Sequence, residues 1–267
     1  MSLTGKQALV TGGSRGIGRG IALKLAEKGV KVAINYRQDK AAANDTLAKV
    51  RERGSDGLII QADVSHPEDI HRMFNEVQAA FGSLDIFVSS ALGEIFAYYR
   101  PPLDLTPEQW DQAVDSQAKA FLVGVQKAAQ LMGKGGRVVA ITYRPGGLTA
   151  SWQPYIAQGS AKAALESLVR YFAVALASRG ITVNAISPGV TEDSVLNALP
   201  PDVQAGIRAW HLGGWTPMGR LATPADIGNA VALLCSEEAG WITGQVIAVD
   251  GGASLMNPDF PLEIQRG

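Results

Sequence analysis

Short apolar runs rich in valine and isoleucine alternate with longer segments of helical period along the whole chain. The runs predict seven strands, at residues 7–12, 31–36, 57–62, 84–90, 136–142, 181–187 and 244–250. The longer segments predict six main helices, at residues 16–28, 40–53, 67–81, 107–132, 155–179 and 224–236. This alternation is typical of βαβ units, and strands that are apolar on both faces fit a sheet covered by helices on both sides. We therefore predict an α/β fold with a doubly wound parallel seven-stranded sheet, in a single domain over residues 1–267.

Two segments, at residues 91–106 and 188–222, do not follow this alternation of strands and helices. The first holds aromatic residues and a double proline, and the second combines proline, glycine and tryptophan with one short helical piece. Both follow the carboxyl end of a predicted strand, where open α/β sheets bind ligands, so we expect them to line a substrate pocket. The same aromatic residues would also suit a lid or a subunit contact. The candidate substrate contacts are Gly93, Phe96, Tyr98 and Trp210. Residues 253–267 are predicted to form a C-terminal tail.

Composition and charge exclude several classes of protein. Hydrophobic residues make up 46% and charged residues 18% of the chain, and the net charge is −1, which fits a soluble globular protein without a nucleic-acid partner. The single cysteine, Cys235, lies in an apolar run, so we expect it to be buried in a reducing compartment. The three histidines have no metal-ligand spacing. With no signal-like N-terminus and no long apolar span, we predict a cytoplasmic protein without a membrane partner.

A glycine-rich stretch, "TGGSRGIGRG" at residues 11–20, joins the first predicted strand to the first predicted helix. Glycines there allow a tight turn and a close approach to a pyrophosphate, whose charge is met by free amides at the helix N-terminus. The context of strand, loop and helix is the one that a dinucleotide-binding motif requires. The residues predicted to contact the cofactor are Gly12, Ser14, Arg15, Gly16, Ile17 and Gly18.

The end of the second predicted strand indicates which dinucleotide is bound. An acidic residue at this place commonly holds a free ribose 2′-hydroxyl, but this chain has Tyr36 followed by Arg37. A second cation, Arg15, lies in the glycine loop, and the guanidinium fork suits a 2′-phosphate. We therefore predict NADPH as the cofactor, the alternative being that both arginines are solvated surface residues.

The stretch "YIAQGSAK" carries a tyrosine and a lysine seven residues apart, Tyr155 and Lys162. Seven steps of 100° return to within ~20° of the same helix face, so both side chains can reach one cleft. This spacing fits either a shared chemical site or helical packing, and the surrounding motifs decide between them.

Taken together, these motifs resemble the short-chain dehydrogenase/reductase family with its Rossmann fold. The glycine loop, "ADV" at 62–64, the Tyr/Lys pair, "NAISPG" at 184–189 and "DGG" at 250–252 occur in the order of that family. The resemblance implies that Asp63 and Val64 lie along the adenine and that Lys162 holds the nicotinamide ribose. It also implies a homodimer or homotetramer, and it adds further cofactor contacts at Ser89, Ala91, Pro188, Gly189 and Val190.

Several positions depart from the pattern of that family. Its tyrosine four residues before the lysine is replaced by Gln158, its active-site asparagine by Gln117, and its catalytic serine by Tyr143. The Tyr-x6-Lys spacing, with a second tyrosine near the end of the fifth strand, resembles the NADPH-dependent enoyl-acyl-carrier-protein reductases and other enoyl thioester reductases. The catalytic candidates are therefore Tyr155, Lys162 and Tyr143.

This resemblance implies the NADPH-dependent reduction of the carbon–carbon double bond of an enoyl thioester, carried on coenzyme A or on acyl carrier protein. Hydride reaches the β-carbon, and Tyr155 stabilises the enolate that forms at the thioester oxygen. Lys162 is expected to favour phenolate character and so to lower the pKa of Tyr155, while Tyr143 lines the thioester side. The alternatives are a ketoreductase that acts on a carbonyl through Tyr155 and a non-catalytic NADPH-binding protein.

Overall fold

The structure is a computed structural model, which describes residues 3–143, 152–257, 259 and 262–265. The described residues form one sheet of seven strands in the order β3-β2-β1-β4-β5-β6-β7, and every neighbouring pair is parallel. The strands are β1 (Gln7–Val10), β2 (Lys31–Tyr36), β3 (Gly57–Gln61), β4 (Ile86–Ser89), β5 (Arg137–Ile141), β6 (Thr182–Pro188) and β7 (Val246–Val249). The predicted doubly wound α/β sheet is confirmed.

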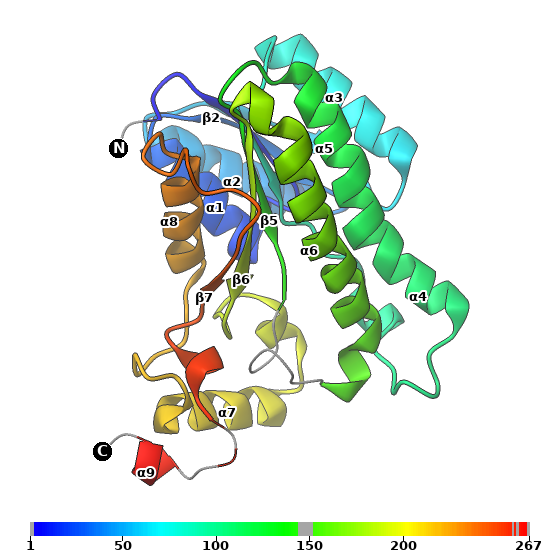
Figure 1. Ribbon diagram of the computed structural model, residues 1–267, viewed down its shortest axis with the longest axis vertical. Coiled ribbons are helices and arrows are strands. Elements are labelled where there is room, and N and C mark those ends of the chain that lie inside the picture. The colour runs from blue at the N-terminus through cyan, green and yellow to red at the C-terminus, as the bar shows by residue number, and fades with distance from the viewer. Residues whose placement is uncertain (1–2, 144–151, 258, 260–261, 266–267) are drawn as a thin grey trace.

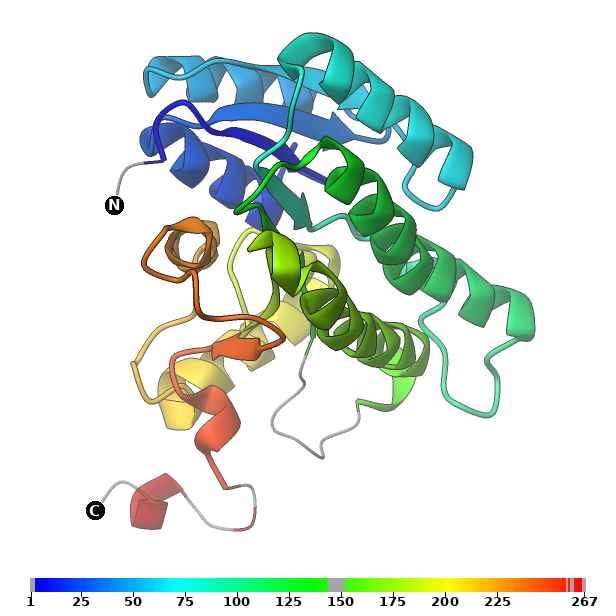
Figure 2. The same cartoon turned by 45° about the horizontal axis from the view of Figure 1, so that its top comes forward.

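Helices cover both faces of the sheet (Figures 1 and 2). One face carries α1 (Gly16–Glu27), α2 (Lys40–Glu52) and α8 (Pro224–Cys235), and the other carries α3 (Pro67–Phe81), α5 (Ala120–Leu131) and α6 (Ile156–Leu176). Alternate residues of β1 divide between the two layers, since Leu9 packs in the core under α3, α5 and α6 while Ala8 and Val10 pack under α1 and α8. Burial of both faces explains why the strands read as nearly continuous apolar runs.

Local signals fix where several helices begin. α4 (Pro107–Val114) and α8 each start with a proline in the first turn after a threonine, Thr106 and Thr223. Each threonine hydroxyl accepts a hydrogen bond from the backbone three residues on, and the side chain there, Gln109 or Asp226, accepts one in return. These reciprocal bonds satisfy amides that the first helical turn leaves free, so the sequence marks both starts.

The segment 107–132 differs in one respect from the single helix predicted for it. Between α4 and α5 the chain makes a wider, π-helical turn at Asp115–Lys119, which turns Ser116 and Gln117 into the interior. The extra residue in this turn shifts the helix register, a distortion that is frequent at functional sites. Helical period alone does not reveal it, because the apolar pattern continues on either side.

The remaining elements lie beyond the carboxyl ends of the strands. α7 (Pro201–Trp210), the short helical piece predicted within residues 188–222, crosses beneath that edge, and α9 (Leu262–Gln265) belongs to the C-terminal tail (Figure 1). Among the described residues, no helix combines the length and apolar character needed to cross a membrane.

Candidate active site

The glycine loop after β1 has the backbone geometry that its sequence predicts. Gly12 and Gly16 have φ angles of +64° and +55°, in the region that favours glycine. A Cβ on Gly18 would lie 2.1 Å from the carbonyl oxygen of Gly12, so only glycine lets α1 start this close to the loop. Ser14 and Gly18 are buried, Ile17 is half-buried and Arg15 is exposed.

Side chains from neighbouring elements hold this loop in place. Arg19 donates two hydrogen bonds to the carbonyl of Ser14, from Nε at 3.1 Å and from Nη2 at 2.9 Å, and Thr46 of α2 donates a third at 3.0 Å. The buried Asn35 accepts from the Gly12 amide at 3.1 Å. These anchors were not predicted from the sequence, although the asparagine inside the apolar run of β2 indicates a polar role at that position.

The N-terminus of α1 faces the loop without a competing anion. The first turn of α1 carries no acidic side chain, and no side chain caps its amides. The first amides of a helix lack intrahelical partners and lie at the positive end of the helix dipole. The loop therefore fits the pyrophosphate of a dinucleotide, held by these amides and by Gly12 to Gly18.

The predicted cofactor contacts after the other strands gather at the same edge. Asp63 and Val64 follow β3, Ser89 and Ala91 follow β4, and Gly189 and Val190 follow Pro188 at the end of β6. The hydroxyl of Thr11 joins two of these turns, because it accepts hydrogen bonds from the amides of Ser90 and Ala91 at 3.0 and 3.1 Å. The structure thus brings together residues from four strand ends.

Arg37, predicted to recognise a 2′-phosphate, forms ion pairs with two carboxylates. Its guanidinium bonds Glu94 of the segment 91–106, and its Nη1 lies 3.9 Å from the carboxylate of Asp63. Tyr36 beside it is buried at the end of β2. The sequence did not indicate Glu94 as a partner, because the contact joins residues that are 57 positions apart.

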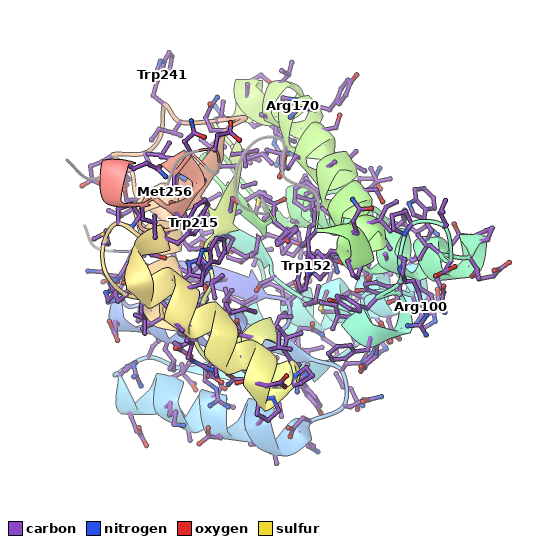
Figure 3. All side chains as sticks on the ribbon, turned by 90° about the horizontal axis from the view of Figure 1, so that it is seen from below. Arg100, Trp152, Arg170, Trp215, Trp241 and Met256 are labelled. Carbon is purple, nitrogen blue, oxygen red and sulfur yellow. The ribbon has the colours of Figure 1, made fainter. Side chains whose placement is uncertain are left out.

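Tyr155 lies at the centre of an aromatic cluster at the start of α6. Its ring centroid is 4.6 Å from that of Tyr143, 5.2 Å from that of Trp152 and 6.5 Å from that of Tyr99. Trp152 stacks on it at an interplanar angle of 19°. Seen from the carboxyl edge of the sheet, Trp152 stands between α6 and α7, near the middle of that face (Figure 3). Tyr155 and Tyr143, both candidates from the sequence, thus lie next to each other. Tyr99 belongs to the segment 91–106 that was expected to line the pocket, whereas Trp152 was not predicted for the site.

Lys162 lies two helical turns further along the same helix, where it is buried. Its Nζ donates a hydrogen bond of 2.6 Å to the carbonyl of Ile141 at the end of β5. Burial lowers the pKa of the Lys162 ammonium from 10.5 to about 7, against a smaller opposing effect of the Glu166 carboxylate. The side chain is therefore held against the carboxyl end of β5.

The expected effect of Lys162 on the pKa of Tyr155 was wrong. Lys162 was expected to lower the pKa of Tyr155, but burial raises the pKa of that phenol, and Tyr143, Tyr98 and Tyr99 raise it further. Two turns of α6 separate the two side chains, and the ammonium is directed at Ile141 instead. Tyr155 thus remains a neutral hydrogen-bond donor in this arrangement, as the Tyr143 phenol also does because burial raises its pKa.

The predicted substrate contacts occupy different environments. Tyr98 is buried, and its hydroxyl donates to Gln158, while Gly93 lies against Tyr98 and Ser116. Phe96 is exposed and contacts Tyr99 at 6.1 Å between ring centroids. Trp210 is half exposed on α7 and stacks on Trp215 at 4.5 Å. Among the described residues, no cluster of histidine, cysteine and acidic side chains could hold a metal ion.

A family model described as enoyl-(acyl carrier protein) reductase matches residues 12–254, most of the chain. The chain belongs to the short-chain dehydrogenase/reductase family. The glycine loop, the parallel sheet and the Tyr155/Lys162 helix described above are the parts of this family's fold that build the site.

Members of this family that are similar to the chain are named for different substrates. The 1-cyclohexenylcarbonyl-CoA reductase of Streptomyces collinus is 38% identical over 95% of this chain and 88% of its own. The tetrahydroxynaphthalene reductase of Pyricularia oryzae is 33% identical over 95% of this chain and 91% of its own. The angucycline C-6 ketoreductase LanV, solved with bound NADP, superposes with a TM-score of 0.85 at 35% identity, covering 96% of this chain and 98% of that one. The names of these relatives thus include a CoA reductase, a tetrahydroxynaphthalene reductase and a ketoreductase.

Proposed function

We propose that this reductase uses NADPH to reduce the carbon–carbon double bond of an α,β-unsaturated acyl thioester. The observation that carries the proposal is the layout of α6, with the buried phenol of Tyr155 two turns before Lys162 and a carboxamide, Gln158, in the turn between them. The family model described as enoyl reductase and the similar CoA reductase of Streptomyces collinus support the same choice.

The chemistry agrees with a neutral phenol at this position. The cofactor supplies a hydride, which forms a C–H bond at the β-carbon while the π electrons move toward the thioester oxygen. Tyr155, whose pKa is raised by burial, donates a hydrogen bond to that oxygen as negative charge develops. The α-carbon then takes a proton from the solvent, so no relay through a serine is needed at the place of Tyr143.

NADPH is proposed over NADH because Arg15 is exposed on the phosphate loop and Arg37 follows β2, and a guanidinium suits a 2′-phosphate. The similar ketoreductase LanV holds NADP. Glu94 and Asp63 now share the Arg37 guanidinium, and a 2′-phosphate would compete with them for it.

The acyl group is proposed to be cyclic. Tyr99 and Trp152 offer flat faces around Tyr155, and Phe96 extends this surface outward. Such a surface suits a ring better than a thin linear chain, because stacked rings bury more area against it. Coenzyme A is preferred as the carrier because the similar Streptomyces collinus enzyme is named as a CoA reductase.

Ketone reduction is the second candidate, favoured by the likeness to LanV and to tetrahydroxynaphthalene reductase. A direct test mixes the purified protein with NADPH and either 1-cyclohexenylcarbonyl-CoA, crotonyl-CoA or acetoacetyl-CoA, and follows NADPH oxidation. Oxidation with the enoyl thioesters and not with the keto compound is expected. Oxidation with the keto compound alone would overturn the proposal, and cofactor binding without any oxidation would indicate a non-catalytic protein.

The role of Tyr155 has a separate test. Tyr155→Phe removes the hydroxyl and keeps the ring stack, so kcat on the preferred substrate should fall by about 10²-fold or more. Tyr171→Phe on the exposed side of the same helix is the matched control and should be neutral. Full turnover by Tyr155→Phe would show that another group stabilises the developing charge.

A further inference from the structure

Asn35 is a polar residue inside the apolar strand β2. It lies between Ile34 and Tyr36, and its exposed fraction is only 2%. A buried carboxamide destabilises a fold unless both its oxygen and its nitrogen have hydrogen-bond partners. The partners of Asn35 therefore show what this position contributes.

Both ends of the Asn35 side chain are bonded to backbone groups. Its Oδ1 accepts a hydrogen bond from the Gly12 amide at 3.1 Å. Its Nδ2 donates to the carbonyl of Ala62 at 3.0 Å, and to the carbonyls of Ile60 and Tyr36 at 3.4 Å each. These partners fix the orientation of the amide, because a flipped side chain would place its NH2 group against the Gly12 N–H and its oxygen against carbonyl oxygens.

These bonds join the ends of three strands. Gly12 belongs to the glycine loop after β1, Tyr36 ends β2, and Ala62 directly follows β3. Backbone bonds strengthen the same junction, since the Gly13 amide donates to the carbonyl of Asn35 and the Ala62 amide donates to that of Tyr36, both at 3.0 Å. One buried side chain thus ties the glycine loop to the ends of β2 and β3.

The same three strand ends border the place of the adenosine ribose. The glycine loop fits the pyrophosphate, and Arg37, directly after β2, carries a guanidinium suited to the 2′-phosphate. Asp63 follows Ala62, and its carboxylate lies 3.9 Å from the Arg37 guanidinium, so the end of β3 borders the same place. In NADPH the adenosine ribose connects the pyrophosphate to the 2′-phosphate. The spacing between the strand ends must therefore match this part of the cofactor.

We propose that Asn35 is a positioning residue for the cofactor, which sets the spacing between the glycine loop and the ends of β2 and β3 and so determines the affinity for the adenosine half of NADPH. It acts through the backbone of Gly12 and Ala62. Hydride transfer takes place at the nicotinamide, at the other end of the cofactor, so the rate of that step should not depend on Asn35. The inference goes beyond the proposed function, because it holds whether the substrate is an enoyl thioester or a ketone.

The test replaces Asn35 by leucine, which has nearly the same shape and makes no side-chain hydrogen bond. Titration with NADPH, followed by fluorescence, should show an affinity lower by about 10- to 100-fold, since a displacement of contacting groups by about 1 Å has an effect of this size. Adenosine 2′,5′-bisphosphate, which contains only the adenosine half, should lose affinity by the same factor. With saturating NADPH, kcat should stay within about 2-fold of the wild type.

Asn184→Leu is the matched control. Asn184 in β6 is 1% exposed, its Nδ2 donates to the carbonyl of Ile242 at 2.7 Å, and its Oδ1 accepts from the Gln245 amide at 3.1 Å. Both partners precede β7, at the opposite edge of the sheet from β3. Asn184→Leu should therefore lower the free energy of unfolding in urea, as Asn35→Leu does, but should leave the affinity for NADPH unchanged.

Asn35→Asp is a second variant that keeps the shape of the side chain and tests the proposal if the leucine variant does not fold. Its carboxyl group can accept from Gly12 in either protonation state, but only the protonated form can donate to Ala62. Burial raises the pKa of such a carboxyl. Relative to the wild type, the affinity of this variant for NADPH should therefore increase as the pH falls.

Four results would each overturn the proposal. They are wild-type NADPH affinity in a folded Asn35→Leu variant, an equal loss of affinity in Asn184→Leu, a loss seen with NADPH but not with adenosine 2′,5′-bisphosphate, and a relative affinity of Asn35→Asp that does not change with pH. A fall in kcat at saturating NADPH as large as the fall in affinity would also contradict it, because Asn35 would then act on hydride transfer.

Discussion

Replacing the buried Lys162 by methionine should stabilise the cofactor-free protein at neutral pH while abolishing its activity. Burial lowers the pKa of this lysine from 10.5 to about 7. At about 1.4 kcal/mol for each tenfold change in proton affinity, folding with a charged Lys162 costs about 5 kcal/mol below pH 7. The methionine variant avoids that cost but loses the hydrogen bond to Ile141, which is worth about 1–3 kcal/mol. The net gain is therefore roughly 2–4 kcal/mol at or below pH 7.

The pH dependence has a definite sign. Between about pH 7 and pH 10.5 the unfolded chain binds more protons at this lysine than the folded one, so wild-type stability rises with pH across that window. The advantage of the Lys162→Met variant should therefore shrink as the pH rises and reverse when the lysine is neutral in both states. Urea unfolding of both proteins without cofactor, from about pH 6 to about pH 10, measures the difference in the free energy of unfolding.

The contributions of all other titrating groups to the pH dependence cancel in this difference, since both proteins contain those groups. Lys134→Met, at an exposed position, controls for the loss of one positive charge and should leave stability nearly unchanged at every pH. A Lys162→Met variant that is less stable than the wild type at pH 7, by the same amount as at pH 10, would refute the reasoning.

Three further predictions concern the cofactor loop and the turn between Tyr155 and Lys162. Glu94→Gln removes one carboxylate from Arg37 and should tighten NADPH binding more than NADH binding. Arg37→Ala should weaken NADPH binding more than NADH binding. If titrations show equal effects on both cofactors, Arg37 does not bind a 2′-phosphate. Gly18→Ala should lower the affinity for NADPH by at least about 10-fold in the same titration, because its Cβ would lie 2.1 Å from a backbone oxygen. A variant with wild-type affinity would show that α1 can shift to make room for the methyl group. Gln158→Tyr places a phenol four residues before Lys162, so the rate of acetoacetyl-CoA reduction relative to that of enoyl-CoA reduction should rise at least about 10-fold. An unchanged ratio of rates would show that this position does not determine which substrate is reduced.

The parts of the site that depend on local geometry were predictable. The glycine loop needs positive φ at Gly12 and Gly16, and the sequence reports that need directly through the residue type. The helix face shared by Tyr155 and Lys162 follows from the 100° step of an α-helix. The resemblance to the reductase family named Tyr155 and Tyr143 as candidates, and the structure adds that their ring centroids lie 4.6 Å apart.

The parts that depend on distant contacts were not predictable. No periodicity links Arg37 to Glu94 or Tyr98 to Gln158, because each pair comes from elements that only the folded sheet brings together. The pKa of Tyr155 also failed as a prediction from sequence, since it depends on burial by Trp152 and other rings around it and not on the nearest cation along the helix.

By itself, therefore, the sequence determined the parallel sheet, the phosphate loop and the face of α6 that Tyr155 and Lys162 share, because strand alternation, glycine conformation and helical period are properties of neighbouring residues. The tertiary structure alone decided the electrostatic character of the site. It buries Tyr155 and Lys162, and it orients Gln158 through Tyr98. Desolvation and hydrogen-bond direction depend on everything packed around a group, and that surrounding exists only in the folded chain.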